Sequence, residues 1–244
     1  MNVIILMAGP SDKFSEAGYK YPKTLVEINN KPIVEIVIDN LRPLITSANK
    51  IIFVTRKVDN DKFYLDNILK LLVPDAFLVE VTGEISGAAV STLLAIEKVD
   101  MLDSLLILNG DQIIDENPLN LVNKLKDFDG GTVVFKSIHP RWSYVKCDED
   151  GFVVEAEEKK PISNLATAGF YYFKNAKKYY EYTKSMILKG AHIDSMFYVC
   201  PVFNEMILDQ KKINVTEINS NQYHSLMDSE MVSIYEKFLE QSNN

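Results

Sequence analysis

The chain has 244 residues and a mass of 27.7 kDa, which is enough for one large domain or two small ones with a substantial core. Apolar residues make up 47% and charged residues 25%, so a disordered, collagen-like or coiled-coil chain is excluded. The formal net charge of −8 argues against nucleic acid as a partner, because phosphate backbones bind basic faces. A few local lysines could still hold a small anionic ligand.

Cysteine usage and the first residues indicate the compartment. Cys147 and Cys200 lie far apart, which gives neither a disulfide framework nor a metal cluster. The apolar run at residues 3–7 is too short for a signal peptide or a membrane span. We therefore expect a cytoplasmic protein with reduced thiols and no membrane partner, and a homo-oligomer is compatible with the sequence.

Strand and helix patterns alternate in the first half of the chain. Continuous apolar runs predict buried strands, and apolar residues at helical spacing predict helices. The expected strands are 2–8, 50–55, 76–81 and 104–108, and the expected helices are 32–44, 59–72 and 87–99. Strand–helix–strand repetition with short links predicts right-handed crossovers and a mostly parallel sheet.

The second half has a different character. Short runs rich in Val, Phe and Tyr, separated by turn signals, predict strands at 130–136, 144–148, 152–156, 168–173 and 213–218. Helices are expected at 175–189, 195–208 and 229–241. The prediction is an α/β fold whose mostly parallel central sheet continues into a mixed, antiparallel second half. We expect one domain over 1–244, with a nucleotide-binding half (about 1–128) and an acceptor-binding half (about 129–244).

The first candidate motif follows the first strand. Residues 8–14 (AGPSDKF) form a small-residue loop, and residues 21–25 (YPKTL) follow it. Backbone N–H groups of such a loop can approach phosphates, and Lys13 and Lys23 could neutralise a polyphosphate. A solvated surface loop with scattered lysines is the alternative.

The second motif, Asn109-Gly110-Asp111-Gln112, directly follows the buried strand 104–108. Ligands of open parallel sheets bind at the carboxyl ends of the strands, so this motif should face the same cleft as the first. A carboxylate there suits Mg²⁺, which takes one or two carboxylates together with phosphate oxygens. The alternative is a turn closed by an Asx hydrogen bond.

The third motif, residues 157–161 (EEKKP), follows the strand 152–156. Glu158 could accept hydrogen bonds from substrate hydroxyls, and Lys159 could bind a phosphate. Clustered opposite charges are more often a solvated face. Gly87 opens a helix and could admit a flat base, although helix packing explains it equally well. Tyr144 is a candidate substrate contact, with core packing as the commoner role for such a residue.

Several other site classes are not supported. His139, His192 and His224 lack the spacing of zinc ligands. The sequence contains no G-x-S-x-G elbow, no P-loop and no G-x-G-x-x-G fingerprint.

Taken in order, the motifs resemble the sugar-1-phosphate nucleotidylyltransferases, or pyrophosphorylases, which have a GT-A-like, Rossmann-type fold. The resemblance spans about residues 2–218 and is close for 21–41 and 139–173. The second of these segments is similar to a bacterial subgroup associated with capsule or surface-polysaccharide synthesis. The resemblance implies Mg²⁺-dependent transfer of a nucleoside monophosphate from an NTP to a phosphorylated small-molecule acceptor, with release of pyrophosphate.

The resemblance also implies roles for individual residues. Ala8, Gly9, Gly87 and Asn109 would contact the nucleotide, with Gly87 beside the base. Lys13 would touch the leaving pyrophosphate, Lys23 would bind the α-phosphate and Asp111 would hold Mg²⁺. On the acceptor side, Glu158 would bind hydroxyls, Lys159 the phosphate, and Gly169 and Tyr144 would contact the acceptor.

The signature loop departs from the family pattern G-x-G-[ST]-R, because it reads Gly9-Pro10-Ser11-Asp12-Lys13. Pro10 lacks an N–H donor, and lysine lacks the bidentate fork of arginine. The late acidic segment of the family is replaced by residues 224–230 (HSLMDSE). Asp228 is the candidate for a second metal carboxylate, or alternatively the N-cap of the last helix.

Two other functions remain open at this point. A glycosyltransferase of related fold would use a nucleotide-sugar donor, but it needs a carboxylate pair such as D-x-D, and here the segment is Asp111-Gln112-Ile113. A catalytically degenerate homologue would bind nucleotide without turnover, which the altered loop allows.

Overall fold

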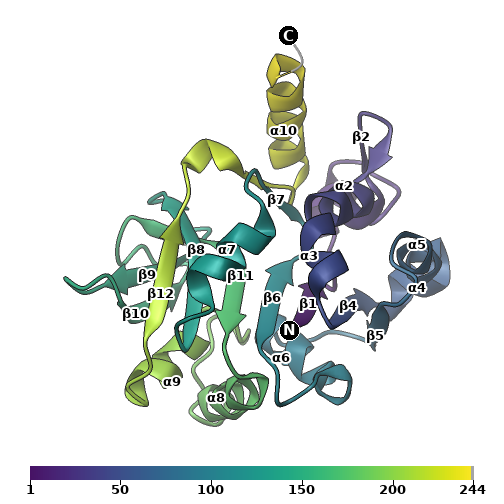
Figure 1. The fold of residues 1–244 in the computed structure, drawn as a ribbon. Helices are drawn as coiled ribbons and strands as arrows, with labels where there is room; N and C mark the ends of the chain where they lie inside the picture. Colours follow the sequence, from purple (N-terminus) through teal and green to yellow (C-terminus); the bar gives the residue numbers. More distant parts are fainter. Residues whose placement is uncertain (243–244) are drawn as a thin grey trace.

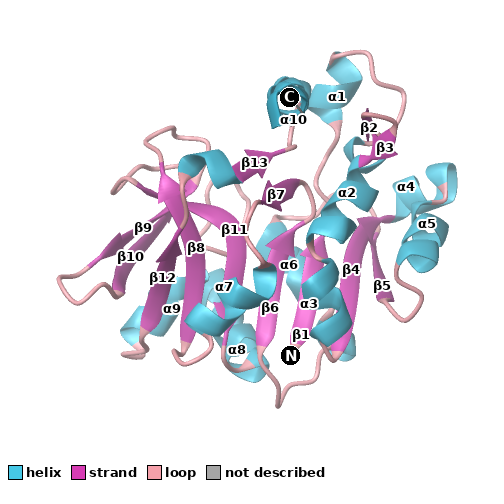
Figure 2. Ribbon diagram, turned by 45° about the horizontal axis from the view of Figure 1, so that its top comes forward, coloured by secondary structure: helices cyan, strands magenta, loops and turns pink. Residues whose placement is uncertain are grey.

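The computed structural model describes residues 1–242 and is built on one nine-stranded sheet, shown in Figures 1 and 2. The strand order is β10-β9-β11-β6-β1-β4-β5, and β8 pairs with both β11 and β12. The strands are β1 (Asn2–Leu6), β4 (Lys50–Arg56), β5 (Phe77–Val81), β6 (Leu105–Asn109), β8 (Gly130–Lys136), β9 (Ser143–Cys147), β10 (Val153–Glu158), β11 (Leu165–Phe173) and β12 (Ile213–Glu217). Two short ribbons pair β2 (Glu27–Ile28) with β3 (Lys31–Pro32) and β7 (Gln112–Ile114) with β13 (Tyr223–Ser225).

Strand direction changes between the two halves of the chain. β1 runs parallel to β4 and β6, and β4 runs parallel to β5. β11 then pairs antiparallel with β6, β8 and β9, so it joins the second half of the chain to the first. The predicted α/β class, with a mostly parallel sheet and an antiparallel second half, is confirmed.

Helices cover both faces of the sheet (Figure 2). They are α1 (Asp12–Glu16), α2 (Ile33–Asn40), α3 (Arg42–Ser47), α4 (Lys57–Phe63), α5 (Leu65–Leu72), α6 (Ala88–Leu94), α7 (Pro118–Leu125), α8 (Ala176–Leu188), α9 (Val202–Leu208) and α10 (Ser229–Ser242). Three short 3₁₀ turns, η1 (Lys23–Leu25), η2 (Ile96–Lys98) and η3 (Ser220–Gln222), complete the elements.

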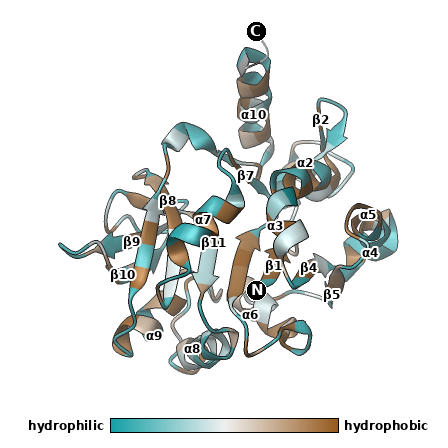
Figure 3. Cartoon of the chain, viewed as in Figure 1, coloured by the Kyte–Doolittle hydropathy of each residue, from teal (hydrophilic) through white to brown (hydrophobic). Residues whose placement is uncertain are grey.

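The hydrophobic core lies in two layers, one on each face of the sheet. Successive side chains of β1 alternate between them: Val3 and Ile5 join the layer with α2 and α7, and Ile4 joins the layer with α6, α8 and α9. This is why the strand reads as a continuous apolar run in the sequence. Figure 3 shows the same pattern, with β1 and β6 brown along their length.

Four predicted helices differ from the observed ones. The helix expected over 32–44 forms as α2 and α3, and the one expected over 87–99 forms as α6 and η2. The helix expected over 59–72 is divided at Tyr64, which has a left-handed backbone (φ 56°) and separates α4 from α5. The helix expected over 195–208 forms only from Val202, because Asp194 and Ser195 also have positive φ and Pro201 stands at its N-cap. The elements α1, α7, β2, β3, β7 and β13 were not predicted.

The segment after β13 ends in α10, which projects away from the sheet in Figure 1. Val232 and Tyr235 are buried on the side of α10 that meets the core. Within residues 1–242, no helix combines the length and apolar character that crossing a bilayer would require.

Candidate active site

A cleft of about 750 Å³ opens where β1, β4 and β6 end. Its walls come from both halves of the chain, as expected for ligand sites of open α/β sheets. Nine of the sequence-predicted residues line it: Ala8, Gly9, Lys23, Gly87, Asn109, Asp111, Glu158, Lys159 and Gly169. Lys13, Tyr144 and Asp228 do not.

A lysine–aspartate pair joins the first two motifs. Nζ of Lys23 lies 2.6 Å from Oδ2 of Asp111, and the two side chains are only 10% and 20% exposed. The backbone N–H of Lys23 donates to Oγ of Ser11 at 3.1 Å, so the loop after β1 holds the start of η1. A Cβ atom on Gly9 would lie 2.9 Å from the ammonium nitrogen, so a larger residue here would displace the end of the lysine side chain.

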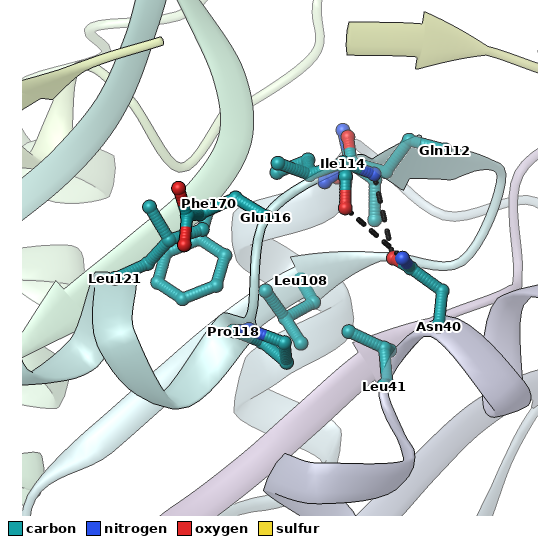
Figure 4. A pocket seen from close by; sticks show the side chains of 10 residues that line it. Asn40, Leu41, Leu108, Gln112, Ile114, Glu116, Pro118, Leu121 and Phe170 are labelled. Carbon is teal, nitrogen blue, oxygen red and sulfur yellow. Dashed lines mark hydrogen bonds between the residues drawn. The ribbon is translucent and has the colours of Figure 1, made fainter. Parts of the chain in front are cut away.

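The turn that carries Asp111 is held from several directions. The N–H of Gly110 donates to the carbonyl of Leu6, and the N–H of Leu226 donates to the carbonyl of Asp111, both at 2.8 Å. The side chain of Asn40 exchanges two hydrogen bonds with the backbone of Ile114, at 3.0 and 3.3 Å, as Figure 4 shows. These bonds fix β7 against α2 and keep the carboxylate at the end of β6.

Figure 4 also shows a small void beneath this turn, between α2, β6 and α7. Its volume is about 10 Å³, close to the space of one water molecule. It is therefore a packing defect under the site and too small for a substrate.

Gly169 lies close to the turn that follows β6. Its φ of +59° lies in the left-handed region, and a Cβ there would lie 2.3 Å from Nδ2 of Asn109 and 2.4 Å from Oε1 of Gln112. Nε2 of Gln112 donates to the carbonyl of Gly169 at 3.1 Å. The pairing of β11 with β8 shifts register around this glycine, which lets its backbone face the cleft.

Glu158 ends β10 on the far wall of the cleft and is only 6% exposed. Burial raises the pKa of its carboxyl group from 4.5 to about 7, against the opposing effects of the Ser143 hydroxyl and the Lys159 charge. The Ser143 hydroxyl donates to Oε2 of Glu158. Near neutral pH this carboxyl group can therefore be protonated or ionised, and it can exchange hydrogen bonds with hydroxyl groups.

Lys159 points into the cleft from a strained backbone. Its φ of 55° is unusual for a residue with a side chain, and its N–H donates to the carbonyl of Trp142 at 3.0 Å. Nζ lies 5.2 Å from the centre of the Tyr198 ring and 3.9 Å from Oδ2 of Asp194. Contact with Tyr198, followed by the charges of Glu158 and Asp194, raises the pKa of Lys159, so its ammonium group is charged at neutral pH.

Three predicted site residues lie elsewhere. Lys13 is paired with Asp228, at 3.1 Å from Nζ to Oδ2. Oδ1 of Asp228 accepts the N–H of Met231 at 3.0 Å, so this carboxylate caps α10 and is not placed as a second metal ligand. Tyr144 is wholly buried, and its hydroxyl donates to the carbonyl of His139 at 2.7 Å, so the acceptor contact is corrected to core packing.

The residues present fit a magnesium ion that arrives with a nucleotide. In residues 1–242 no three His, Cys, Asp or Glu side chains are grouped as a ready-made metal site. The Lys23 pair occupies Oδ2 of Asp111, which leaves Oδ1 for a ligand. One carboxylate is sufficient for Mg²⁺ when phosphate oxygens and water supply the other ligands.

Arg56, Arg141, Trp142 and Ser143 are among the cleft residues that the sequence analysis did not select as site residues. For Arg56 a signal existed, because it directly follows the buried strand expected at 50–55. The rule that selected Asp111, a charged residue at the carboxyl end of a parallel strand, selects Arg56 as well. Arg141 and Trp142 stand in the loop before β9, where nothing in the sequence marks a contact.

Comparison with known proteins agrees with this geometry. The family model described as nucleotidyl transferase matches residues 2–218. The bifunctional protein GlmU of Methanocaldococcus jannaschii is 32% identical over 177 residues, which are 71% of this chain and 40% of that protein. GlmU of Methanococcus aeolicus is 26% identical over 178 residues, covering 72% of this chain and 40% of that one. The chain thus spans about 40% of the length of these curated relatives.

Among solved structures, a nucleoside-diphosphate-sugar pyrophosphorylase from Vibrio cholerae RC9 has the same fold. The TM-score is 0.84 at 22% identity, over 96% of this chain and 99% of that chain. The family match covers both the loop that carries Lys23 and the strand that ends at Glu158. The chain belongs to the nucleotidyl transferase family.

Proposed function

We propose that the protein is a Mg²⁺-dependent nucleotidylyltransferase that joins a nucleoside monophosphate from an NTP to a sugar phosphate or a similar small phosphorylated acceptor. The observation that carries the proposal is the placement in one cleft of the Lys23–Asp111 ion pair and of the neighbouring side chains Glu158 and Lys159. The first pair suits a nucleotide and its metal, and the second suits a phosphorylated acceptor that also carries hydroxyl groups. Membership of the family and likeness to a sugar-nucleotide pyrophosphorylase support this reading.

The reaction needs little covalent participation by the protein. An oxygen of the acceptor phosphate forms a bond to the α-phosphorus of the NTP. The bond between that phosphorus and the α–β bridging oxygen breaks, and its electron pair leaves with pyrophosphate. Positioning and charge neutralisation therefore supply the rate enhancement.

On the nucleotide side, Lys23 would contact the α-phosphate and stabilise the charge that develops there in the transition state. Its pairing with Asp111 keeps the ammonium group at the carboxyl end of β6. The backbone at Ala8 and Gly9 and the side chain of Asn109 would bound the nucleotide, and Gly87 at the start of α6 would lie beside the base.

Asp111 would hold the magnesium ion. When bound, the ion neutralises the charge of the phosphates and orients them. The turn around Asp111, fastened by Leu6, Leu226 and Asn40, keeps the carboxylate in place for this role.

On the acceptor side, Lys159 would bind the acceptor phosphate, and Glu158 would exchange hydrogen bonds with its hydroxyl groups. The backbone of Gly169, which faces the cleft, would contact the acceptor as well. The two halves of the chain would act as one domain, because a single sheet runs through both.

The likeness of residues 139–173 to proteins of capsule and surface-polysaccharide synthesis suggests the purpose. We propose that the product is an activated precursor for such a polymer, made in the cytoplasm, where NTPs are available. The protein could act as a monomer or as a homo-oligomer, since each chain holds a whole cleft.

The test is pyrophosphate release by the purified protein with each NTP and a panel of sugar phosphates, in the presence of magnesium. Turnover with one pair of substrates is the expected result. Absence of turnover in protein shown to be folded, together with tight NTP binding by calorimetry, would indicate a degenerate homologue. Release of a nucleoside diphosphate from a nucleotide sugar would indicate a glycosyltransferase instead.

A further inference from the structure

Arg56 is a charged residue of the cleft that the proposed roles above leave unused. It ends β4, the strand next to β1, and lines the cleft together with Gly9, Pro10 and Lys23. Its side chain is 24% exposed, so the guanidinium group is partly withdrawn from solvent and still open to a ligand.

The orientation of this guanidinium group is fixed by a buried partner. Asp59, whose side chain is only 5% exposed, accepts hydrogen bonds from Nε and Nη2 of Arg56, both at 2.8 Å. Nη2 also lies 3.3 Å from Oγ of Ser11, the atom that accepts the backbone N–H of Lys23. The arginine is thereby tied to the loop after β1, and none of these bonds uses Nη1.

The loop itself offers few groups for a phosphate. Pro10 has no N–H, and Asp12, which also lines the cleft, adds a negative charge to this loop. Lys13 is 61% exposed and is turned toward Asp228, outside the cleft. A triphosphate bound along this loop therefore needs positive charge from another element, and a pre-oriented guanidinium group is well suited to phosphate oxygens.

We propose that Arg56, and not Lys13, binds the β- and γ-phosphates of the NTP. The inference rests on the proposed nucleotidyl transfer and assigns its leaving-group site. When the bond to the α-phosphorus breaks, the electron pair goes to pyrophosphate, and Arg56 stabilises the added negative charge. Asp59 is a positioning residue that keeps the guanidinium plane toward the cleft.

The proposal is tested by measuring the affinity of the free protein for nucleoside triphosphate, diphosphate and monophosphate in the presence of magnesium. Because Arg56→Gln alone would leave Asp59 buried without a partner, we compare Arg56→Gln/Asp59→Asn with the unaltered protein. Asp59→Asn, which removes the positioning carboxylate but keeps the guanidinium group, should give an intermediate loss. The double variant is expected to lose about tenfold or more in triphosphate affinity, which is the size of effect expected for a lost charge-assisted hydrogen bond. Its affinity for the monophosphate should fall by less than about threefold. Arg56→Lys keeps the positive charge but not the bidentate geometry of the guanidinium group. Its triphosphate affinity should therefore lie between that of the unaltered protein and that of the double variant.

Two further variants make the result specific. Lys57→Ala removes a neighbouring exposed cation that pairs with Asp61, and it should leave all three affinities unchanged. Lys13→Ala should weaken triphosphate binding less than the double variant does. The assignment would be overturned if the triphosphate affinity of the double variant lay within about twofold of that of the unaltered protein, or if triphosphate and monophosphate lost affinity equally.

The outcome also separates this inference from the proposed function. If the unaltered protein neither binds nor turns over any NTP, the nucleotidyl transfer fails, and the inference fails with it. If the unaltered protein releases pyrophosphate and the Arg56 variants bind triphosphate equally well, only the inference fails.

Discussion

The ammonium group of Lys23 and the carboxylate of Asp111 lie 2.6 Å apart, although 88 positions separate them in the chain. Each fixes the other at the meeting point of β1 and β6, and each is mostly shielded from water. A phosphate that enters the cleft competes with Asp111 for the lysine, and a cation competes with Lys23 for the aspartate. The pair therefore suits a ligand that carries both a phosphate, which can bind Lys23, and a cation, which can bind Asp111. A magnesium nucleotide is such a ligand.

Removal of either partner should slow the reaction strongly. Lys23→Ala and Asp111→Asn are each expected to lower the rate of pyrophosphate release by about tenfold or more, because each loses a charge positioned for the phosphates. Lys20→Ala, an exposed lysine of the same loop, is the matched control and should be near normal. Near-normal rates in both cleft variants would refute the site assignment.

Glu158 should make the stability of the protein depend on pH. Its pKa is raised from 4.5 to about 7, so the folded state holds the proton more tightly than the unfolded state does. This contribution to stability is fully present below about pH 4.5 and is lost as the pH rises to about 7, a change of about 3 kcal/mol at one pKa unit per 1.36 kcal/mol.

Glu158→Gln has no such titration, and it isolates the effect. The free energy of unfolding of the variant, relative to that of the unaltered protein, should therefore rise across this pH range. Urea denaturation at several pH values measures the difference. A difference that stays constant between pH 4.5 and 7 would contradict the buried environment of this carboxyl group.

Two glycines with positive φ provide a matched comparison. Gly151→Ala meets no atom within 4 Å, so it should lose only the backbone preference, about 1 kcal/mol. Gly169→Ala would also push against Asn109 and Gln112, and it should cost clearly more in the free energy of unfolding. Equal losses in chemical denaturation would show that the approach of β11 to the turn at Asp111 is not tight.

Asp228 should act as a helix cap. Asp228→Ala is expected to destabilise the protein by about 1 kcal/mol, while Asp228→Asn retains an oxygen that can accept the N–H of Met231 and should be nearly as stable as the unaltered protein. The magnesium concentration that gives half-maximal activity should stay within about twofold in Asp228→Asn, since the carboxylate caps α10. A tenfold increase in this magnesium concentration would instead indicate that Asp228 is a ligand of the metal.

The sequence predicted the buried strands well because a strand covered on both faces is apolar at successive positions, as at residues 3–6 and 105–108. It failed at Tyr64, since helical spacing of apolar residues continues across a single left-handed residue. It also missed β7 and β13, which have three residues each and form only because each pairs with the other.

The site residues also divide into those that the local sequence predicted and those that depend on a distant partner. Lys23 and Asp111 were predicted because each stands next to a buried strand or in the loop that follows one. Lys13 was placed by analogy with an arginine, but the local sequence could not show that a distant helix cap, Asp228, would pair with it. Arg56 was passed over because its partner Asp59 makes the segment look like an ordinary surface helix start.

The antiparallel pairing of β11 with β6 limits how the molecule can move. Phe170 to Phe173 are bonded along Leu105 to Leu108, in the middle of the sheet that both halves share. A hinge between the halves would have to break this ladder, so we expect the two halves to move as one body. Any closure over bound substrates is then expected from the loops at the rim of the cleft.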